Sequence, residues 1–241
     1  MKVDIKTYKE VHRPTFILEE ERLRNNLELI SSVAKMANVE IILAFKAYAL
    51  WKTFPIFREY IQSTTASSLA EARLAIDKFG SQAHTFSPAY TDYEIDEIAA
   101  CSSHLTFNSL TQYERLHERA RKQNPEISFG LRINPEYSEI ETDIYNPCFK
   151  NSRLGTTLDN FDDSLIDGIE GLHFHTMCEQ GADVLKRTIP HIEEKFGKYL
   201  YNMKWINLGG GHHITRDDYD LDILIECVNY LHDKYGVQVY L

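Results

Sequence analysis

One lysine stands out chemically because it interrupts an apolar run. Lys46 lies in the segment 41–50, whose sequence is IILAFKAYAL. A strand this apolar is expected to be buried, and burial lowers the pKa of a lysine because the interior disfavours charge. The neutral amine is a nucleophile that can form a Schiff base with an aldehyde cofactor such as pyridoxal phosphate. The alternative is a lysine at a strand end whose charged head reaches solvent, which is the commoner case for a lysine taken alone.

A triple glycine is the second chemical signal. Gly209, Gly210 and Gly211 follow a short apolar segment, Lys204–Leu208. Glycines let backbone N–H groups approach a phosphate closely, and the loop after the seventh strand of a barrel is a recurrent phosphate site. The spacing is not that of a dinucleotide-binding GxGxxG loop. The alternative interpretation is a flexible turn.

Two histidines alternate along another apolar segment. His173 and His175 are separated by one residue, so on a strand both imidazoles point to the same side. They are either a metal pair that lacks a third ligand, or one packed residue and one ring lying flat on a planar cofactor, which we prefer. Arg132 ends a further strand and either supports the cofactor or pairs with a carboxylate. His212 and His213 are interpreted as loop residues that face solvent.

Short apolar segments alternate with amphipathic ones along the chain. The expected strands are Ile41–Ala47, Ile61–Ser67, Ala83–Ser87, His104–Asn108, Ile127–Ile133, Ile169–His175, Lys204–Leu208 and Val237–Leu241. The expected helices are Ser68–Phe79, Asp92–Ala100, Leu110–Lys122, Asp183–Tyr201 and Leu221–Tyr235. Eight strands separated by helices predict an α/β fold, a parallel (β/α)8 barrel. A doubly wound sheet is the alternative, because strand number alone does not close a barrel.

Three segments depart from this repeat. Thr15–Leu18 is strand-like and precedes an expected helix at Glu19–Met36, and Asn134–Asn160 is a long polar loop of the kind that often carries function. The sequence ends inside the eighth strand, which leaves that strand without a following helix. We therefore expect residues 1–241 to be the barrel of a longer protein, with residues 1–20 joining a further domain.

Composition excludes several partners. The 241 residues carry a formal net charge of −10 without a cluster of lysine or arginine, so nucleic acid and anionic membranes are poor partners, whereas a cationic substrate suits the charge. Four cysteines without a CxxC pair indicate a reducing compartment and no zinc site. The N-terminus has no apolar signal core, and a soluble cytoplasmic protein is expected.

Six motifs in order resemble a known family. They are FK at 45–46, ASSLAE at 66–71, LRINP at 131–135, SRLG at 152–155, HFHTMCE at 173–179 and NLGGGH at 207–212. This pattern resembles the alanine racemase-fold (fold type III) pyridoxal phosphate decarboxylases. The ASSLAE and HFHTMCE segments favour the carboxynorspermidine/carboxyspermidine branch, which serves spermidine biosynthesis. Diaminopimelate, ornithine or arginine decarboxylases and racemases of the fold, or a pyridoxal phosphate carrier protein, are alternatives.

The resemblance implies roles for individual residues. Lys46 would hold the cofactor covalently, and His175 would stack on its ring. The glycine loop would bind the phosphate, with Arg132 and Ser68 as nearby supports. Cys178 stands where relatives carry a serine near the phosphate. The resemblance also implies a C-terminal β domain, an acidic residue for the pyridine nitrogen beyond Leu241, and a homodimer with shared active sites.

Overall fold

The fold is a closed parallel barrel. The computed structural model describes residue 8 and residues 11–241. Eight strands pair in sequential order, and every pair is parallel. They are β1 (Leu43–Ala44), β2 (Thr64–Ala66), β3 (Ala83–Phe86), β4 (Ser102–Phe107), β5 (Ser128–Arg132), β6 (Ile169–His173), β7 (Trp205–Asn207) and β8 (Gln238–Tyr240).

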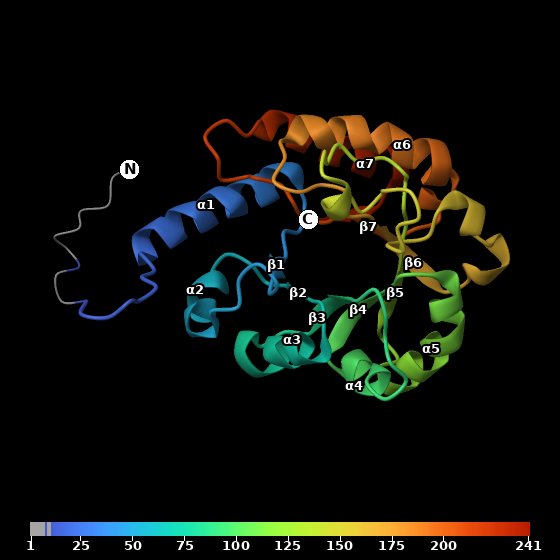
Figure 1. The fold of residues 1–241 in the computed structure, drawn as a ribbon, viewed down its shortest axis with the longest axis horizontal. Coiled ribbons are helices and arrows are strands. Elements are labelled where there is room, and N and C mark those ends of the chain that lie inside the picture. The colour runs from blue at the N-terminus through green and yellow to red at the C-terminus, as the bar shows by residue number, and fades with distance from the viewer. Residues whose placement is uncertain (1–7, 9–10) are drawn as a thin grey trace.

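Hydrogen bonds join the first and last strands. The N–H of Ile42 donates to the carbonyl of Leu241 at 2.8 Å, and the N–H of Leu241 donates to the carbonyl of Glu40 at 3.0 Å. Figure 1 shows the C-terminus beside the segment that leads into β1. This closure, with the unbroken strand order, confirms the (β/α)8 barrel and excludes a doubly wound sheet, in which the order reverses.

Helices surround the strands (Figure 1). The α-helices are α1 (Glu20–Ala37), α2 (Phe54–Phe57), α3 (Leu69–Leu74), α4 (Ile95–Ala100), α5 (Leu110–Gln123), α6 (Ala182–Leu200) and α7 (Leu221–Tyr235). A 3-10 turn (Trp51–Thr53) precedes α2, and a wider turn (Ala75–Phe79) extends α3. Each helix of the sequence analysis is confirmed to within three residues at its ends, and α2 was missed because its four residues are too few to show periodicity.

Local sequence explains where the helices begin and end. The hydroxyl of Ser68 accepts the N–H of Glu71 at 3.3 Å and so caps α3, as predicted. The Glu71 carboxylate in turn accepts the backbone N–H of Ser67 at 2.7 Å. In a standard capping box it would accept the N–H of the cap residue itself, Ser68. At the other ends, Gly80 and Gly236 take φ values of 83° and 68°, which side chains disfavour.

The helix α1 covers the side of the barrel where the strands close. It packs against α7, and its Val33 and Ala37 share a hydrophobic core with Val239 of β8. The expected helix after β8 would consist of residues beyond Leu241 and stays a prediction, but α1 already contacts β8 on this side. A helix that precedes the first strand reaches the same place, because β1 and β8 are neighbours in a closed barrel.

Trp205 fills part of the barrel interior by lying against two glycines. Gly130, Gly171 and Trp205 are in register on β5, β6 and β7. A Cβ atom on Gly171 would lie 2.0 Å from the indole, and one on Gly130 would lie 2.3 Å from it. These positions must stay glycine, since protein interiors have no spare volume for a colliding carbon.

Other expected segments differ from the structure. β5 and β6 are joined by the long loop without an α-helix, with 3-10 turns at Asp143–Tyr145, Leu158–Asn160 and Asp163–Leu165. Thr15–Leu18 forms no strand in the described part of the chain, and Phe16 within it is fully exposed. Residues 1–7, 9 and 10 of the expected N-terminal segment lie outside the described residues, so its association with a further domain stays a prediction.

The helices of the described residues include none with the length and hydropathy needed to cross a membrane.

Candidate functional site

A cavity at the carboxyl ends of the strands gathers most of the predicted residues. Lys46, Arg132, His173, His175, Gly209 and Gly210 all line it. They follow or end β1, β5, β6 and β7, which is where a parallel barrel places its reactive side chains. The fold therefore brings together residues that are up to 164 positions apart in the sequence.

Lys46 lies in a turn and not in a buried strand. β1 covers only Leu43–Ala44, because the N–H groups of Ala47 and Tyr48 both turn back to the carbonyl of Ala44 at 3.0 Å. Lys46 is exposed, so the expectation of a buried lysine is wrong. Lys46 nevertheless lines the cavity, and its positive charge contributes to the lowered pKa of His175.

His175 is held as a neutral ring. Its Nδ1 accepts the backbone N–H of Gly210 at 2.9 Å, which leaves the proton on Nε2. Burial, followed by the positive charges of Lys46 and Arg132, lowers the pKa of His175 to about 3. An uncharged ring with one fixed tautomer suits the stacking role that was predicted for it.

His173 lies on the same side of its strand, as predicted. The two imidazoles are 6.5 Å apart between ring centroids. Burial holds the pKa of His173 well below its usual range, and its Nδ1 lies 3.1 Å from Oδ1 of Asn207. Within the described residues, no group of three or more His, Cys, Asp or Glu side chains is arranged to hold a metal ion.

Arg132 is a buried cation without a carboxylate among the described residues. It is only 4% exposed, and Nη2 donates to the carbonyl of His175 at 3.3 Å. The guanidinium lies 4.9 Å from the ring centroid of Phe86. Burial lowers the pKa of Arg132 to about 10, so it stays charged at neutral pH. The structure thus favours a ligand-facing arginine over one paired within the barrel.

The neighbouring Cys148 does not neutralise Arg132. Burial raises the pKa of this thiol to about 11, so it remains protonated at neutral pH. A neutral thiol leaves the guanidinium charge uncompensated. Unpaired buried charges are costly and are usually kept where a ligand supplies the opposite charge.

The glycine turn is shaped by close backbone contacts. Gly209 has a φ of 75° and Gly211 a φ of 98°. A Cβ on Gly209 would lie 2.4 Å from the Phe174 carbonyl oxygen, and one on Gly211 would lie 2.3 Å from that of Met177. Both glycines are thus required by the turn itself, which packs on the segment after β6.

Two amides of this turn already have partners inside the protein. The N–H of Gly209 donates to Oδ1 of Asn207 at 2.8 Å, and that of Gly210 donates to His175. The prediction that all three glycine amides bind a phosphate is therefore not the arrangement seen here. Gly210 has its amide on His175 and its Cα side open to the cavity.

Three predicted residues, Gly211, Ser68 and Cys178, lie away from the cavity lining. Ser68 is exposed and caps α3, and the nearby Ser67 and Glu71 line the cavity in its place. Cys178 is also exposed, and its backbone packs against Gly211. Their roles toward a cofactor stay predictions.

Sequence reasoning missed Asn207 and Phe86. Asn207 fixes both His173 and the first glycine through one amide oxygen, and Phe86 contacts Arg132. Both residues end a strand, which is the same position in sequence that identified Arg132. Their side chains, an amide and a phenyl ring, carry neither a charge nor a nucleophile, so residue type alone does not mark them as site residues.

Two known decarboxylases are similar to this chain in sequence. No family model matches the chain. It is 43% identical over 234 residues to the carboxynorspermidine/carboxyspermidine decarboxylase of Campylobacter jejuni, covering 97% of this chain and 60% of that protein. It is 41% identical to the carboxyaminopropylagmatine decarboxylase of Synechocystis sp., covering 92% of this chain and 57% of the relative.

A solved structure shows the same architecture. The crystal structure of carboxynorspermidine decarboxylase from Campylobacter jejuni, complexed with norspermidine, matches with a TM-score of 0.87 at 42% identity. The match covers 96% of this chain and 59% of that one, so the chain spans about 60% of the length of these relatives. Over nearly its whole length, the chain therefore resembles the carboxynorspermidine/carboxyspermidine decarboxylases and has their alanine racemase-type barrel.

Proposed function

We propose that the full-length protein is a pyridoxal phosphate-dependent decarboxylase that converts carboxynorspermidine or carboxyspermidine to norspermidine or spermidine. The observation that carries this proposal is the 43% identity to such a decarboxylase across the segments that place Lys46, His175 and the glycine turn around one cavity. Chemistry at the carboxyl ends of the strands fits the barrel.

The residues present fit an anionic planar cofactor. Arg132 lines the cavity, and its buried Nε has no partner among the described residues. Buried polar groups are otherwise almost always paired, so Arg132 is suited to an anionic ligand. Thr176 Oγ1 and His212 Nε2 are also buried without a partner in the described part of the chain, but neither residue lines the cavity, and the expectation that His212 faces solvent is wrong. A phosphate or phenolate oxygen would supply the negative charge that Arg132 lacks.

Each of three cavity residues would have its own role toward the cofactor. Lys46 would attach the cofactor and give way to the substrate amine. Neutral His175 would support one face of the ring, and Arg132 would hold its anionic edge. When bound, pyridoxal phosphate accepts the electron pair that remains when carbon dioxide leaves. The N–H of Gly210, which donates to His175 Nδ1, would keep the His175 ring in one orientation.

Gly210 offers a test of the cofactor proposal. We expect Gly210→Val to weaken cofactor affinity by about tenfold or more, because the added side chain projects into the cavity, where crowding a bound group is costly. Folding should be nearly unaffected, since a Cβ there meets only His175 Cε1 at 3.6 Å. Absorbance titration with pyridoxal phosphate and urea unfolding provide the two measurements. Unchanged affinity would mean that the turn has no part in the site.

The substrate proposal predicts strong discrimination. We expect carboxynorspermidine or carboxyspermidine to be decarboxylated about a hundredfold better than ornithine, lysine, arginine or diaminopimelate, measured as carbon dioxide release. Pocket carboxylates that pair with distal amines would be left unpaired by a short substrate, at a cost of a few kcal/mol. Equal turnover of ornithine or diaminopimelate would contradict the proposal.

A second candidate substrate is carboxyaminopropylagmatine. The relative that carries this name is 41% identical, nearly as similar as the first. The same assay should therefore include it beside the two carboxylated triamines. If the enzyme prefers this compound, the proposed decarboxylation still holds, and only the group at the far end of the substrate differs.

Assembly and location are further proposals. We infer a homodimer with shared active sites from the resemblance to the carboxynorspermidine/carboxyspermidine decarboxylases. A reducing, cytoplasmic compartment is supported by four cysteines that are all free in the structure.

The carbon dioxide assay also separates the alternative functions. A racemase would return an amino acid without release of carbon dioxide, and a pyridoxal phosphate carrier protein would turn over none of the substrates.

A further inference from the structure

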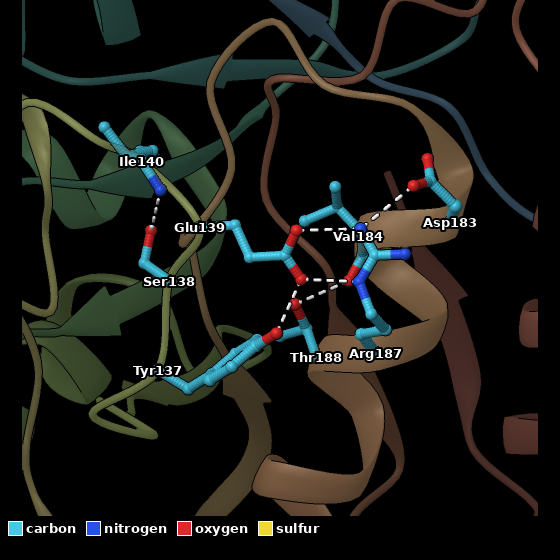
Figure 2. Close-up of polar contacts among 8 residues, drawn as sticks. All are labelled: Tyr137, Ser138, Glu139, Ile140, Asp183, Val184, Arg187 and Thr188. Atoms are coloured by element: carbon cyan, nitrogen blue, oxygen red, sulfur yellow. Dashed lines mark hydrogen bonds and ion pairs between the residues drawn. The ribbon is translucent and has the colours of Figure 1, made fainter.

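The long loop after β5 lies along one face of α6. Asp183, Arg187, His191 and Lys195 are spaced four residues apart on this helix, so they form one stripe, the α6 stripe. The loop segment 136–139 runs beside it and contacts three of the four residues. Figure 2 shows the part around Glu139 and Arg187.

The central contact is a bidentate ion pair. Arg187 Nε and Nη2 donate to the two carboxylate oxygens of Glu139 at 2.6 and 2.7 Å, and Nη2 also donates to Asp183 at 2.9 Å. The hydroxyl of Tyr137 donates to Glu139 at 2.5 Å. The Arg187 guanidinium lowers the pKa of Glu139 to about 2, so the pair is charged at any physiological pH.

Contacts on either side extend the pair along the helix. Tyr137 stacks on His191 with ring centroids 3.8 Å apart and an interplanar angle of 18°. Lys195 forms an ion pair with Glu136, whose φ of 58° is unusual for a side-chain-bearing residue. Successive contacts one helical turn apart fix both the position and the direction of the loop segment.

The same segment also contacts the chain that follows His175. Ser138 Oγ donates to the carbonyl of Thr176 at 2.7 Å and accepts the N–H of Ile140 at 3.3 Å. Thr176 directly follows His175, whose carbonyl accepts Arg132 and whose ring accepts Gly210. Ser138 thus links the loop to the turn that carries the predicted stacking ring.

We propose that Arg187 is a positioning residue: its bridge to Glu139 holds Ser138 against the Thr176 carbonyl and so fixes the His175 ring on the glycine turn. Arg187 is half exposed and on the outer helix, remote from the cavity lining. An isolated exposed pair stabilises little, but a bidentate pair within a network holds a geometry. Local order can then change while global stability does not.

The test measures amide hydrogen exchange in the cofactor-free, full-length protein. We expect Arg187→Gln to speed exchange at the amides of Ile140 and Gly210 by about fivefold. This is the size of effect expected when one well-formed surface ion pair no longer opposes local opening. Gly210 lies 23 residues from Arg187 in sequence, and its amide reports the bond to His175. Ser138→Ala should speed exchange at Gly210 with the helix untouched.

The matched control is Arg119→Gln, which removes a comparable bidentate pair with Asp96 on α4 at 3.1 and 2.7 Å. It should leave Gly210 exchange unchanged. Faster exchange at Ile140 alone would show that Arg187 only anchors the loop, and no change at either amide would show that the bridge is not formed; both overturn the proposal.

Cofactor affinity supplies a second readout, which rests on the proposed function. We expect the dissociation constant for pyridoxal phosphate to rise about fivefold in Arg187→Gln and to stay unchanged in Arg119→Gln. If the protein binds no cofactor, the proposed function fails while the exchange result still stands or falls alone.

Discussion

Replacing Lys46 with alanine is expected to abolish turnover, by on the order of a thousandfold or more, while the barrel stays folded. Lys46 is an amine that faces the cavity beside His175, and its turn after β1 makes few demands on the side chain. Without the amine, no covalent link to the cofactor forms. Carbon dioxide release measures the activity, and urea unfolding measures the fold.

A labelling experiment assigns the amine directly. Full-length protein loaded with pyridoxal phosphate should be yellow, and borohydride should bleach the band and leave the label on Lys46. Lys52→Ala is the matched control, because Lys52 lies close by in sequence, over the ring of Trp51, and does not line the cavity. A label recovered on a different lysine would refute the assignment.

Acid is expected to destabilise the cofactor-free barrel well before the carboxylates titrate. Burial lowers the pKa of His175 to about 3, and those of His104 and His212 to about 4. In the unfolded chain these rings titrate near 6.5, so below that pH the unfolded state binds more protons. Stability is therefore complete above pH 6.5 and is lost as the pH falls toward 4.

The effect should be large because burial also holds the pKa of His84 and His173 well below the usual range, so five rings act in the same direction. Each contributes roughly 1 kcal/mol per pH unit below 6.5, so we expect a loss of roughly 4 to 6 kcal/mol between pH 7.5 and 5.5. Urea unfolding at both pH values measures it. His104→Gln should flatten the dependence by about a fifth, whereas His12→Gln, at an exposed position, should not. A flat profile in the parent protein would contradict the burial of these rings.

The positions of strands and helices were determined by sequence pattern. Apolar segments of five to seven residues marked every strand, although the hydrogen-bonded parts are shorter, as in β1 and β7. Helix ends followed from local chemistry, because Ser68 and Gly80 act within one turn of the helix. The cavity residues could be named for a related reason: in a barrel, the residue after each strand lies at the same rim.

What depended on distant contacts was decided only by the tertiary structure. The exposure of Lys46 follows from the turn after β1, which an apolar segment does not reveal. Whether Arg132 has a partner depends on residues from several strands, and the fit of Trp205 on two glycines depends on register. The cover supplied by α1 and the bridge from α6 to Glu139 join segments about 200 and 48 residues apart. Such contacts depend on closure of the barrel, and sequence periodicity reports only on the neighbours of each residue along the chain.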